Sequence, residues 1–221
     1  MPANPHKIDI FDFDGTLFRN PPDTAENRKL YEKKTGLPWI ITKELSRKLS
    51  KQHGKFIGMR NGWYGRRETL EPPLVPDPAP SSMFIESVCE RFRQSKKDDE
   101  TYTFIMTGRH RGIANQVLRI LGDGALVSVK RKGIKDGKLY VESVDKNVQF
   151  FFMGDDGPTK MDSPKPTSTL PWKVWIMESL LDYYPEVDTI EIWEDREEHV
   201  EAFQQLNSDW PHHVIVNFVT D

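Results

Sequence analysis

The sequence predicts an α/β protein in which a mostly parallel β-sheet lies between two layers of helices, as a three-layer sandwich. Short apolar runs of strand length alternate along the chain with longer segments whose apolar residues recur every three or four positions. Alternating strands and helices of this kind are typical of a parallel sheet with helices on both faces. Of the 221 residues, 37% are hydrophobic, including six Trp and twelve Phe, which is enough to bury a core.

Each element is expected where the pattern of apolar residues changes. Short apolar runs bounded by polar or turn residues predict strands, which are expected over residues 7–13, 102–106, 126–129, 139–144, 148–153, 189–193 and 214–219. Apolar residues at helical spacing predict helices, which are expected over residues 24–35, 42–53, 83–92, 113–121, 174–184 and 197–206. Residues 61–80 read as a loop rich in Gly and Pro, and residues 154–171 as a polar loop.

The length fits one domain over residues 1–221. We expect a small helical and loop insertion over residues 20–80 and a second hairpin and loop insertion over residues 126–168. No apolar stretch approaches the roughly 18 residues of a membrane span, and the N-terminus lacks the apolar centre of a secretory signal. The single cysteine, Cys89, excludes an internal disulfide and suits a reducing compartment. We therefore expect a cytoplasmic or nuclear location, with Cys89 packed in the core.

The first strand ends in two carboxylates, Asp12 and Asp14, which are followed by Gly15 and Thr16. A turn at Gly15 lets both carboxylates converge on one ligand. Crowded carboxylates repel each other unless a cation or a proton neutralises one of them, and Mg²⁺ is the natural cation for hard oxygen ligands. A carboxylate beside such a metal can also attack phosphorus. The alternative is an acidic turn on a solvated surface.

Polar residues also follow the second strand, and ligands of open α/β sheets lie at the carboxyl ends of strands. The segment contains Thr107, Gly108, Arg109 and Arg111. Hydroxyl and guanidinium donors beside a helix N-terminus are suited to binding a phosphate. The alternative is a helix cap with incidental arginines.

The run Asp12–Thr16 resembles the first signature of the haloacid dehalogenase (HAD) superfamily, Asp-x-Asp-x-Thr, in its phosphotransferase form. The resemblance implies a HAD-like Rossmannoid fold with a small cap-like insertion. It also implies that Asp12 is the nucleophile and that Asp14 is the general acid and base. Thr107 resembles the second signature, and Lys173 resembles the third, a lysine that neutralises phosphate and nucleophile together.

Asp195 resembles the fourth signature, an acid that completes the metal site, with Glu194 as the second choice. Asp155 and Asp156 are alternatives, but they precede Lys173 and lead into a Pro-rich loop. The resemblance implies Mg²⁺ as cofactor and the following site residues: metal ligands Asp12, Asp14 (through its backbone carbonyl), Asp195 and Glu194; catalytic residues Asp12, Asp14, Thr107 and Lys173; substrate-binding residues Gly108, Arg109 and Arg196.

A narrower resemblance is carried by Asn61-Gly62-Trp63-Tyr64, Thr107-Gly108-Arg109, Thr169–Lys173 and Trp193-Glu194-Asp195-Arg196 with His199. Together these segments resemble the HAD family of Swiss Army Knife RNA-repair proteins. The acid-Asp-Arg ending also resembles the phosphatase half of polynucleotide kinase–phosphatase. Both resemblances imply a nucleic-acid end, such as a 3′-phosphate, as substrate.

Charge is distributed unevenly along the chain. Basic residues gather at Lys43, Arg47, Lys48, Lys51, Lys55, Arg60, Arg66 and Arg67, with Glu44 as the single acid among them. Such a segment indicates an anionic partner, and we expect nucleic acid to bind through Lys43, Arg47, Lys48 and Lys51, which recur at helical spacing. The alternative is an ordinary solvated helix face.

These observations predict a Mg²⁺-dependent phosphohydrolase that acts through an aspartyl-phosphate, on nucleic-acid (RNA) phosphate ends. The insertion over residues 20–80 is short for a full cap domain, and an open site favours a macromolecular substrate. Two alternatives stay open: a phosphatase for a nucleotide, another small phosphometabolite or a phosphoprotein, and a noncatalytic nucleic-acid-binding module with the same fold.

Overall fold

The computed structural model describes residues 5–54, 56–58, 62–135, 138–143, 145 and 147–220. The chain forms two compact units. The first unit consists of Met1–Arg19 and Pro78–Asp221, and the second unit consists of Asn20–Asp77. No helix among the described residues combines the length and the apolar character needed to cross a membrane.

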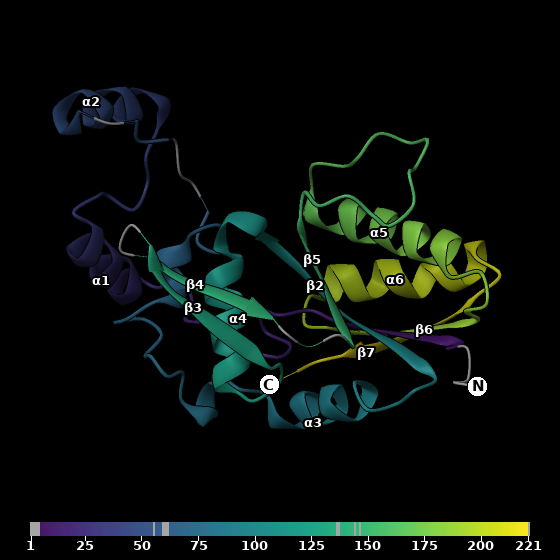
Figure 1. Ribbon diagram of the computed structural model, residues 1–221. Coiled ribbons are helices and arrows are strands. Elements are labelled where there is room, and N and C mark those ends of the chain that lie inside the picture. The colour runs from purple at the N-terminus through teal and green to yellow at the C-terminus, as the bar shows by residue number, and fades with distance from the viewer. Residues whose placement is uncertain are drawn as a thin grey trace. The chain divides into compact units, whose positions relative to one another are not determined.

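The first unit is built on a five-stranded parallel sheet (Figure 1). Its strands are β1 (Lys7–Phe11), β2 (Thr101–His110), β5 (Val148–Met153), β6 (Thr189–Glu194) and β7 (His213–Phe218), in the spatial order β5-β2-β1-β6-β7. Each neighbouring pair is parallel. The predicted α/β class and the mostly parallel sheet are therefore confirmed.

Helices cover both faces of this sheet (Figure 1). The helices α5 (Thr169–Tyr183) and α6 (Glu197–Asp209) lie on one face, and α3 (Glu86–Ser95) lies on the other. Side chains alternate between the two faces of a strand, so Ile8 and Ile10 of β1 join the core under α5 and α6, whereas Phe11 packs edge-on against Phe92 of α3 at 5.1 Å. Cys89 of α3 is fully buried, which confirms its predicted place in the core.

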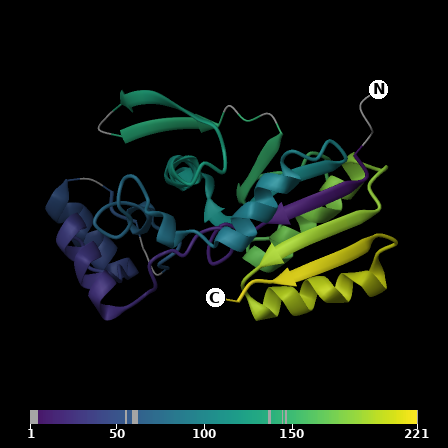
Figure 2. The same cartoon turned by 90° about the horizontal axis from the view of Figure 1, so that it is seen from below.

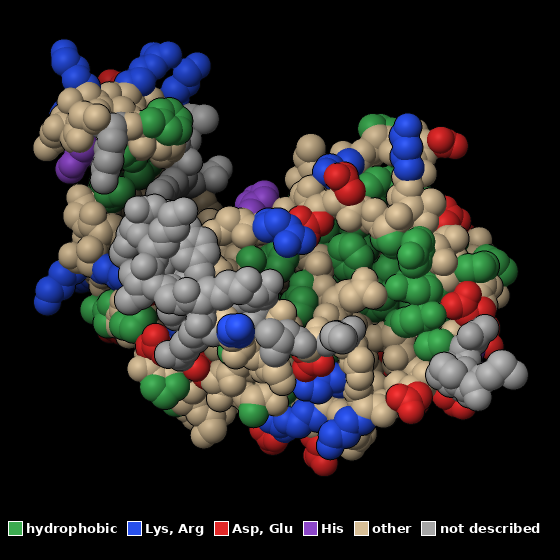
Figure 3. Space-filling view, viewed as in Figure 1, with side chains coloured by type: hydrophobic (Ala, Val, Ile, Leu, Met, Phe, Trp, Pro, Cys, Tyr) green, Lys and Arg blue, Asp and Glu red, His purple; other side chains and the backbone are tan. Residues whose placement is uncertain are grey.

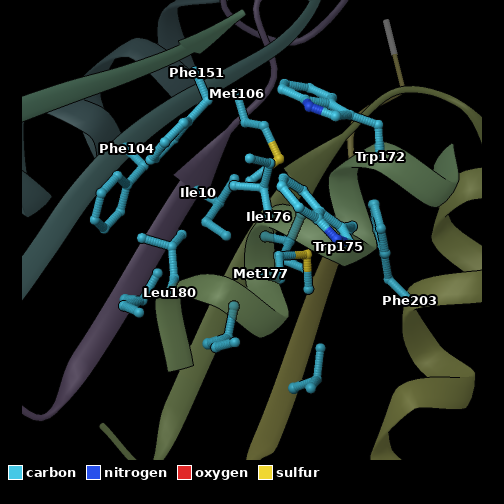
Figure 4. Packing of buried hydrophobic residues seen from close by; sticks show 14 of the residues in the cluster. Ile10, Phe104, Met106, Phe151, Trp172, Trp175, Ile176, Met177, Leu180 and Phe203 are labelled. Atoms are coloured by element: carbon cyan, nitrogen blue, oxygen red, sulfur yellow. The ribbon is translucent and has the colours of Figure 1, made fainter. Parts of the chain in front are cut away.

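A large core cluster lies between the sheet and α5 (Figure 4). Large side chains of α5, including Trp172, Trp175 and Ile176, belong to this cluster together with Phe104 and Met106 of β2. Burying one side chain of this size contributes about 1.5–3 kcal/mol. This cluster therefore fixes α5, and with it Lys173, against the ends of the strands.

A separate antiparallel hairpin of β3 (Val129–Lys135) and β4 (Lys138–Ser143) packs beside α4 (Ala114–Asp123). In Figure 2 the helix α4 is seen end on. The predicted strand over residues 126–129 is wrong. The backbone N–H groups of Leu126 and Val127 donate to the carbonyl of Leu121, so these residues complete the C-terminus of α4 and the strand begins only at Val129. Asp136 and Gly137, between the two strands of the predicted hairpin, lie outside the described residues.

Other element boundaries differ from the prediction for local reasons. The first strand ends at Phe11, and β2 continues to His110 with a register shift after Thr107. The short 3₁₀ turn η2 (Ser81–Met83) precedes α3; a second such turn, η3 (Arg111–Ile113), follows β2. Helix α5 begins within the predicted loop, with Pro171 in its first turn, where a missing N–H costs nothing.

The second unit contains α1 (Ala25–Thr35), α2 (Lys43–His53) and the 3₁₀ turn η1 (Arg67–Leu70). The side chains of Thr24 and Thr42 accept hydrogen bonds from the first turns of α1 and α2, as N-cap residues do. Two small clusters form its core: Tyr31, Trp39, Trp63 and Leu74, and Ile41, Leu49 and Ile57.

Candidate active site

The predicted site residues gather at the carboxyl ends of β1, β2 and β6. Strand β1 lies between β2 and β6, and the chain reaches β6 only after it has built β2 and β5 on the other side. Such a reversal of strand order is where open α/β sheets bind ligands. The topology therefore places the segments after Phe11, Met106 and Trp193 at one edge of the sheet.

Asp12 lies at the centre of this edge and is only 2% exposed. Its backbone N–H donates to the carbonyl of Trp193 at 3.1 Å, which holds it beside β6. Its Oδ1 forms an ion pair with Nζ of Lys173 at 3.1 Å. The angles at this contact are not those of a hydrogen bond, and neither carboxylate oxygen accepts one from the described residues. Burial raises the pKa of Asp12 to about 6, although the Lys173 ammonium opposes the shift.

Lys173 lies between two carboxylates. Its Nζ donates to Oε2 of Glu194 at 2.6 Å and faces Asp12, and its side chain is almost completely buried. Burial acts to lower the pKa of this ammonium, but the Asp12 and Glu194 charges outweigh it and raise the pKa overall. The cation is therefore fixed beside the predicted nucleophile, in the place where a bound phosphate would need neutralisation.

His199 is a site residue for which no role was predicted from the sequence. It is 2% exposed, and its Nδ1 lies 3.2 Å from Oε2 of Glu194. Burial acts to raise the pKa of Glu194, but Lys173 and His199 lower it overall. The sequence signals were its place in the segment that resembles the Swiss Army Knife family and its position in the first turn of the helix that follows Asp195. Periodicity cannot reveal that the ring lies against Glu194.

Asp195 comes close to the loop that follows Asp14. Gly15 has φ +72°, and a Cβ built there would lie 2.0 Å from Oδ2 of Asp195. Only glycine therefore allows this approach. Burial raises the pKa of Asp195 to about 7, and the charges of Asp12 and Glu194 act in the same direction.

The carboxylates of Asp12, Glu194 and Asp195 each offer one oxygen within 4.8 Å of the others. Both oxygens of Asp12 and Oδ1 of Asp195 are buried and accept no hydrogen bond from the described residues, which is costly unless another group satisfies them. A set of hard oxygen donors with unsatisfied charge fits Mg²⁺. Because Glu194 already accepts a hydrogen bond from Lys173, Asp12 and Asp195 are the better ligands.

The two alternative acids are engaged elsewhere. Asp155 forms an ion pair with Arg111, with Nε 2.6 Å from Oδ1, and accepts the backbone N–H of Phe152 at 2.8 Å. Asp156 accepts from Lys165 at 2.7 Å. Neither belongs to the acid cluster found among the described residues.

Asp14 is not part of that cluster and is paired with Arg109 instead. Nε of Arg109 donates to Oδ1 and Oδ2 of Asp14 at 2.9 and 2.8 Å, and Nη2 donates to Oδ1 at 2.6 Å. Arg109 is 1% exposed. The structure thus directs this guanidinium at the predicted acid and base, whereas we expected it to bind phosphate.

Thr107, Gly108 and Arg196 form another side of the site. Thr107 is fully buried, and its Oγ1 accepts the backbone N–H of Arg109 at 3.2 Å. A Cβ at Gly108 would lie 2.9 Å from Cγ2 of Thr169 and 3.6 Å from Nη2 of Arg196, so glycine leaves room for both. Burial lowers the pKa of Arg196, but the surrounding carboxylates raise it overall, and no described residue accepts a hydrogen bond from its side chain.

The basic residues of the second unit fall into two groups. Lys43, Arg47, Lys48 and Lys51 are exposed on α2, and none of them pairs with an acid in the described part of the chain; Figure 3 shows Lys and Arg side chains gathered over α2. Arg66 does not belong to this face, because it is 4% exposed and its guanidinium lies 4.0 Å from the ring centroid of Trp39. Lys55, Arg60 and Asn61 lie outside the described residues.

A family model described as HAD domain family 1 in Swiss Army Knife RNA repair proteins matches residues 38–219. A solved structure described as a haloacid dehalogenase-like hydrolase from Burkholderia xenovorans is similar with a TM-score of 0.47 and 10% identity, over 97% of this chain and 82% of that chain. No curated protein matches the chain.

The family match covers most of the chain and includes the residues predicted as the second, third and fourth signatures, from Thr107 to Asp195. Asp12 and Asp14 precede it, but the sheet places them beside the matched signatures. The resemblance to the HAD superfamily and to its Swiss Army Knife family, stated from the sequence, is therefore confirmed. The chain is a hydrolase domain of the HAD superfamily and belongs to HAD domain family 1 of the Swiss Army Knife RNA repair proteins.

Proposed function

We propose that the chain is a Mg²⁺-dependent phosphohydrolase that forms an aspartyl-phosphate on Asp12 and removes phosphate from nucleic-acid (RNA) ends. The observation that supports this most directly is the state of Asp12. Among the described residues, Oδ1 has only the ammonium of Lys173 as a polar partner, at 3.1 Å, and the buried Oδ2 accepts no hydrogen bond. A structural carboxylate in a core is normally fully hydrogen-bonded, whereas a nucleophile needs a free oxygen.

In the first half of the proposed reaction, a carboxylate oxygen of Asp12 attacks the phosphorus of a monoester. The bond from phosphorus to the leaving oxygen breaks while Asp14 donates its proton to that oxygen. Lys173, beside Asp12, neutralises charge on the transferring group. The hydroxyl of Thr107 and the guanidinium of Arg196 donate to its non-bridging oxygens.

In the second half, a water molecule attacks the phosphorus and passes a proton to Asp14. The bond from phosphorus to Asp12 breaks, which frees phosphate and returns both carboxyl groups to their starting states. The carboxylates of Asp12 and Asp195 would hold Mg²⁺, together with the backbone carbonyl of Asp14, and the carboxylate of Glu194 lies beside them. When bound, the ion supplies neutralisation and alignment of the phosphate.

A nucleic-acid substrate is supported by the second unit. Its helix α2 carries four exposed, unpaired cations among the described residues, and cations of this kind bind phosphate backbones. Phe56, just after α2, is 89% exposed, and exposed aromatic rings offer surfaces on which bases stack. The family description, which refers to RNA repair proteins, is consistent with this substrate.

The proposal is tested with a panel of 3′- and 5′-phosphorylated oligonucleotides, free nucleotides, sugar phosphates and a phosphopeptide, each assayed with Mg²⁺. Highest kcat/KM on an oligonucleotide, with affinity that falls steeply with salt, is the expected result. Preference for a small phosphate would favour the metabolite phosphatase. Tight oligonucleotide binding without release of phosphate would favour the noncatalytic module.

The metal site is tested by a matched pair of variants. Asp195→Asn should raise the Mg²⁺ concentration needed for half-maximal activity about tenfold or more, because it removes an anionic ligand. Asp156→Asn, which alters an acid outside the cluster, should leave that concentration unchanged. If Asp156→Asn raises the Mg²⁺ requirement and Asp195→Asn does not, the fourth signature lies at residues 155–156 and not at Asp195.

A further inference from the structure

Two arginines of the site are in opposite situations. The guanidinium of Arg109 makes three hydrogen bonds to Asp14, whereas no described residue accepts a hydrogen bond from that of Arg196. Arg109 is 1% exposed, so rotating it toward a substrate phosphate would break these bonds inside the protein and leave a buried carboxylate unpaired. Arg196 can donate to a phosphate without losing any contact.

The contacts of Arg109 are also uneven between the two oxygens of Asp14. Oδ1 accepts from both Nε and Nη2, at 2.9 and 2.6 Å, whereas the one donor to Oδ2 in the described part of the chain is Nε, at 2.8 Å. A proton on Oδ2 would therefore leave both bonds to Oδ1 intact. The backbone of Arg109 is fixed as well, because its N–H donates to Oγ1 of Thr107.

We infer that Arg109 is a positioning residue: it anchors Oδ1 of Asp14 and leaves Oδ2 to carry the proton that is exchanged with the leaving group and with water. This inference rests on the proposed phosphohydrolase function. In the first half of the reaction Oδ2 loses its proton to the leaving oxygen, and in the second half it takes one from water. Arg109 itself neither binds the phosphate nor transfers a proton.

The inference has a chemical consequence that phosphate binding does not share. An alkoxide, such as the oxygen of a ribose, leaves poorly without a proton, whereas 2,4-dinitrophenolate leaves readily without one. General acid catalysis contributes roughly 10²–10⁴-fold where the leaving group needs it. Misplacing Asp14 should therefore slow hydrolysis of the first kind of ester and spare the second.

The test compares Arg109→Met, Arg109→Lys, Asp14→Asn and the double variant Asp14→Asn/Arg109→Met on two substrates, a 3′-phosphorylated oligonucleotide and 2,4-dinitrophenyl phosphate. Arg109→Met should lower kcat on the oligonucleotide about 10²-fold and change formation of the phospho-enzyme from the dinitrophenyl ester less than threefold. Arg109→Lys, which restores one donor and the charge, should recover part of the loss. The double variant should be no slower than Asp14→Asn alone, because both changes act on one step.

Arg196→Met is the matched control. It should raise KM on both substrates alike, since it removes a donor to phosphate without touching Asp14. Thermal unfolding shows whether each variant is folded. If Arg109→Met does not fold, the two substrates are compared with Arg109→Lys and with the double variant, in which no carboxylate is left unpaired.

Equal rises in KM on both substrates for the Arg109 variants would overturn the inference and return Arg109 to phosphate binding. Losses that multiply in the double variant would overturn it too. A wild-type protein that hydrolyses neither ester with Mg²⁺ would instead refute the proposed function, and would reduce the Arg109–Asp14 pair to a structural contact.

Discussion

At the strand ends of the sheet, charged side chains are buried and form ion pairs with one another, whereas the basic side chains of α2 are exposed and pair with no acid among the described residues. Lys173 contacts Asp12 and Glu194 within 3.1 Å, and all three side chains are at most 3% exposed. Lys48 and Lys51 of α2, in contrast, are exposed and pair with no acid among the described residues.

This difference separates charges suited to chemistry from charges suited to binding. Inside the protein the effective dielectric constant is low, so each charge strongly affects its neighbours and removing one leaves another uncompensated. On α2, water and salt screen each charge, so single residues contribute little and act together. Substitutions and changes of pH in the two regions should therefore have effects of very different size.

The largest effect is expected for Asp12→Asn. The amide is nearly isosteric with the carboxylate but is not a nucleophile and binds Mg²⁺ weakly, so kcat should fall by roughly 10³-fold or more. The matched control is Asp9→Asn, a buried acid on the same strand that should keep most of the activity. Steady-state assays on the best substrate of the panel decide this, and full activity of Asp12→Asn would refute the assignment of the nucleophile.

The second prediction concerns stability. Lys173→Met should lower the free energy of unfolding by about 3–5 kcal/mol, because it leaves buried Glu194 and Asp12 without their cation. The control is Lys165→Met, which breaks a 2.7 Å ion pair with the exposed Asp156 and should cost less than about 1 kcal/mol. Urea unfolding in EDTA measures both. Equal losses would contradict the contrast between buried and exposed pairs.

The third prediction concerns pH. Asp12 and Asp195 have pKa values raised to about 6 and about 7 in the folded protein, from an ordinary value of 3.8. Folding therefore takes up protons at pH values between 3.8 and the raised pKa of each group. Stability of the metal-free protein is therefore greatest near pH 4–5 and falls as pH rises through 6–7. The opposite contribution of Glu194, whose pKa is lowered, is lost only below its ordinary value of 4.5.

Thermal unfolding in EDTA should show Tm falling by roughly 5 °C between pH 5 and pH 8, and saturating Mg²⁺ should remove most of the fall. The double variant Asp12→Asn/Asp195→Asn should show a flat profile in this range. A wild-type Tm that rises with pH in EDTA would mean that folding does not raise the pKa values of these two carboxyl groups.

The smallest effect is expected on α2. Arg47→Glu/Lys51→Glu should weaken oligonucleotide binding and flatten the slope of log Kd against log salt by about 1.4, at about 0.7 for each phosphate contact to a single strand. Lys29→Glu/Lys33→Glu, on the exposed side of α1 in the same unit, makes the same change in net charge. If both pairs of substitutions weaken binding equally, the effect is one of total charge and α2 is not a binding face.

The sequence allowed the site to be located because parallel strands bring their carboxyl ends to one edge. Asp12, Thr107 and Asp195 are far apart in the chain, but each lies at the end of a predicted apolar strand or just after it. Pattern reasoning could therefore place them together without any knowledge of contacts. The order β5-β2-β1-β6-β7 puts all three at the reversal of strand order.

Contacts between side chains could not be predicted in the same way. Periodicity assigns a residue to a face, but it does not say that Arg109 reaches Asp14 or that His199 lies against Glu194. Arg66 shows the same limit, since its charge suggested an exposed face, whereas Tyr31 and Trp39 enclose its guanidinium. Local propensity likewise gave a strand at Leu126, where hydrogen bonds to the preceding helix prevail.

The buried thiol of Cys89 offers a kinetic view of the same site. Its Sγ donates to the carbonyl of Leu17 at 3.5 Å, in the loop that follows the acids of the first signature, and burial raises its pKa to about 11. As the single cysteine, it reacts with a thiol reagent only while that loop or α3 has lifted away. The labelling rate thus reports how often the loop or α3 opens, and a ligand that keeps both closed should slow the rate by the factor by which it suppresses these openings.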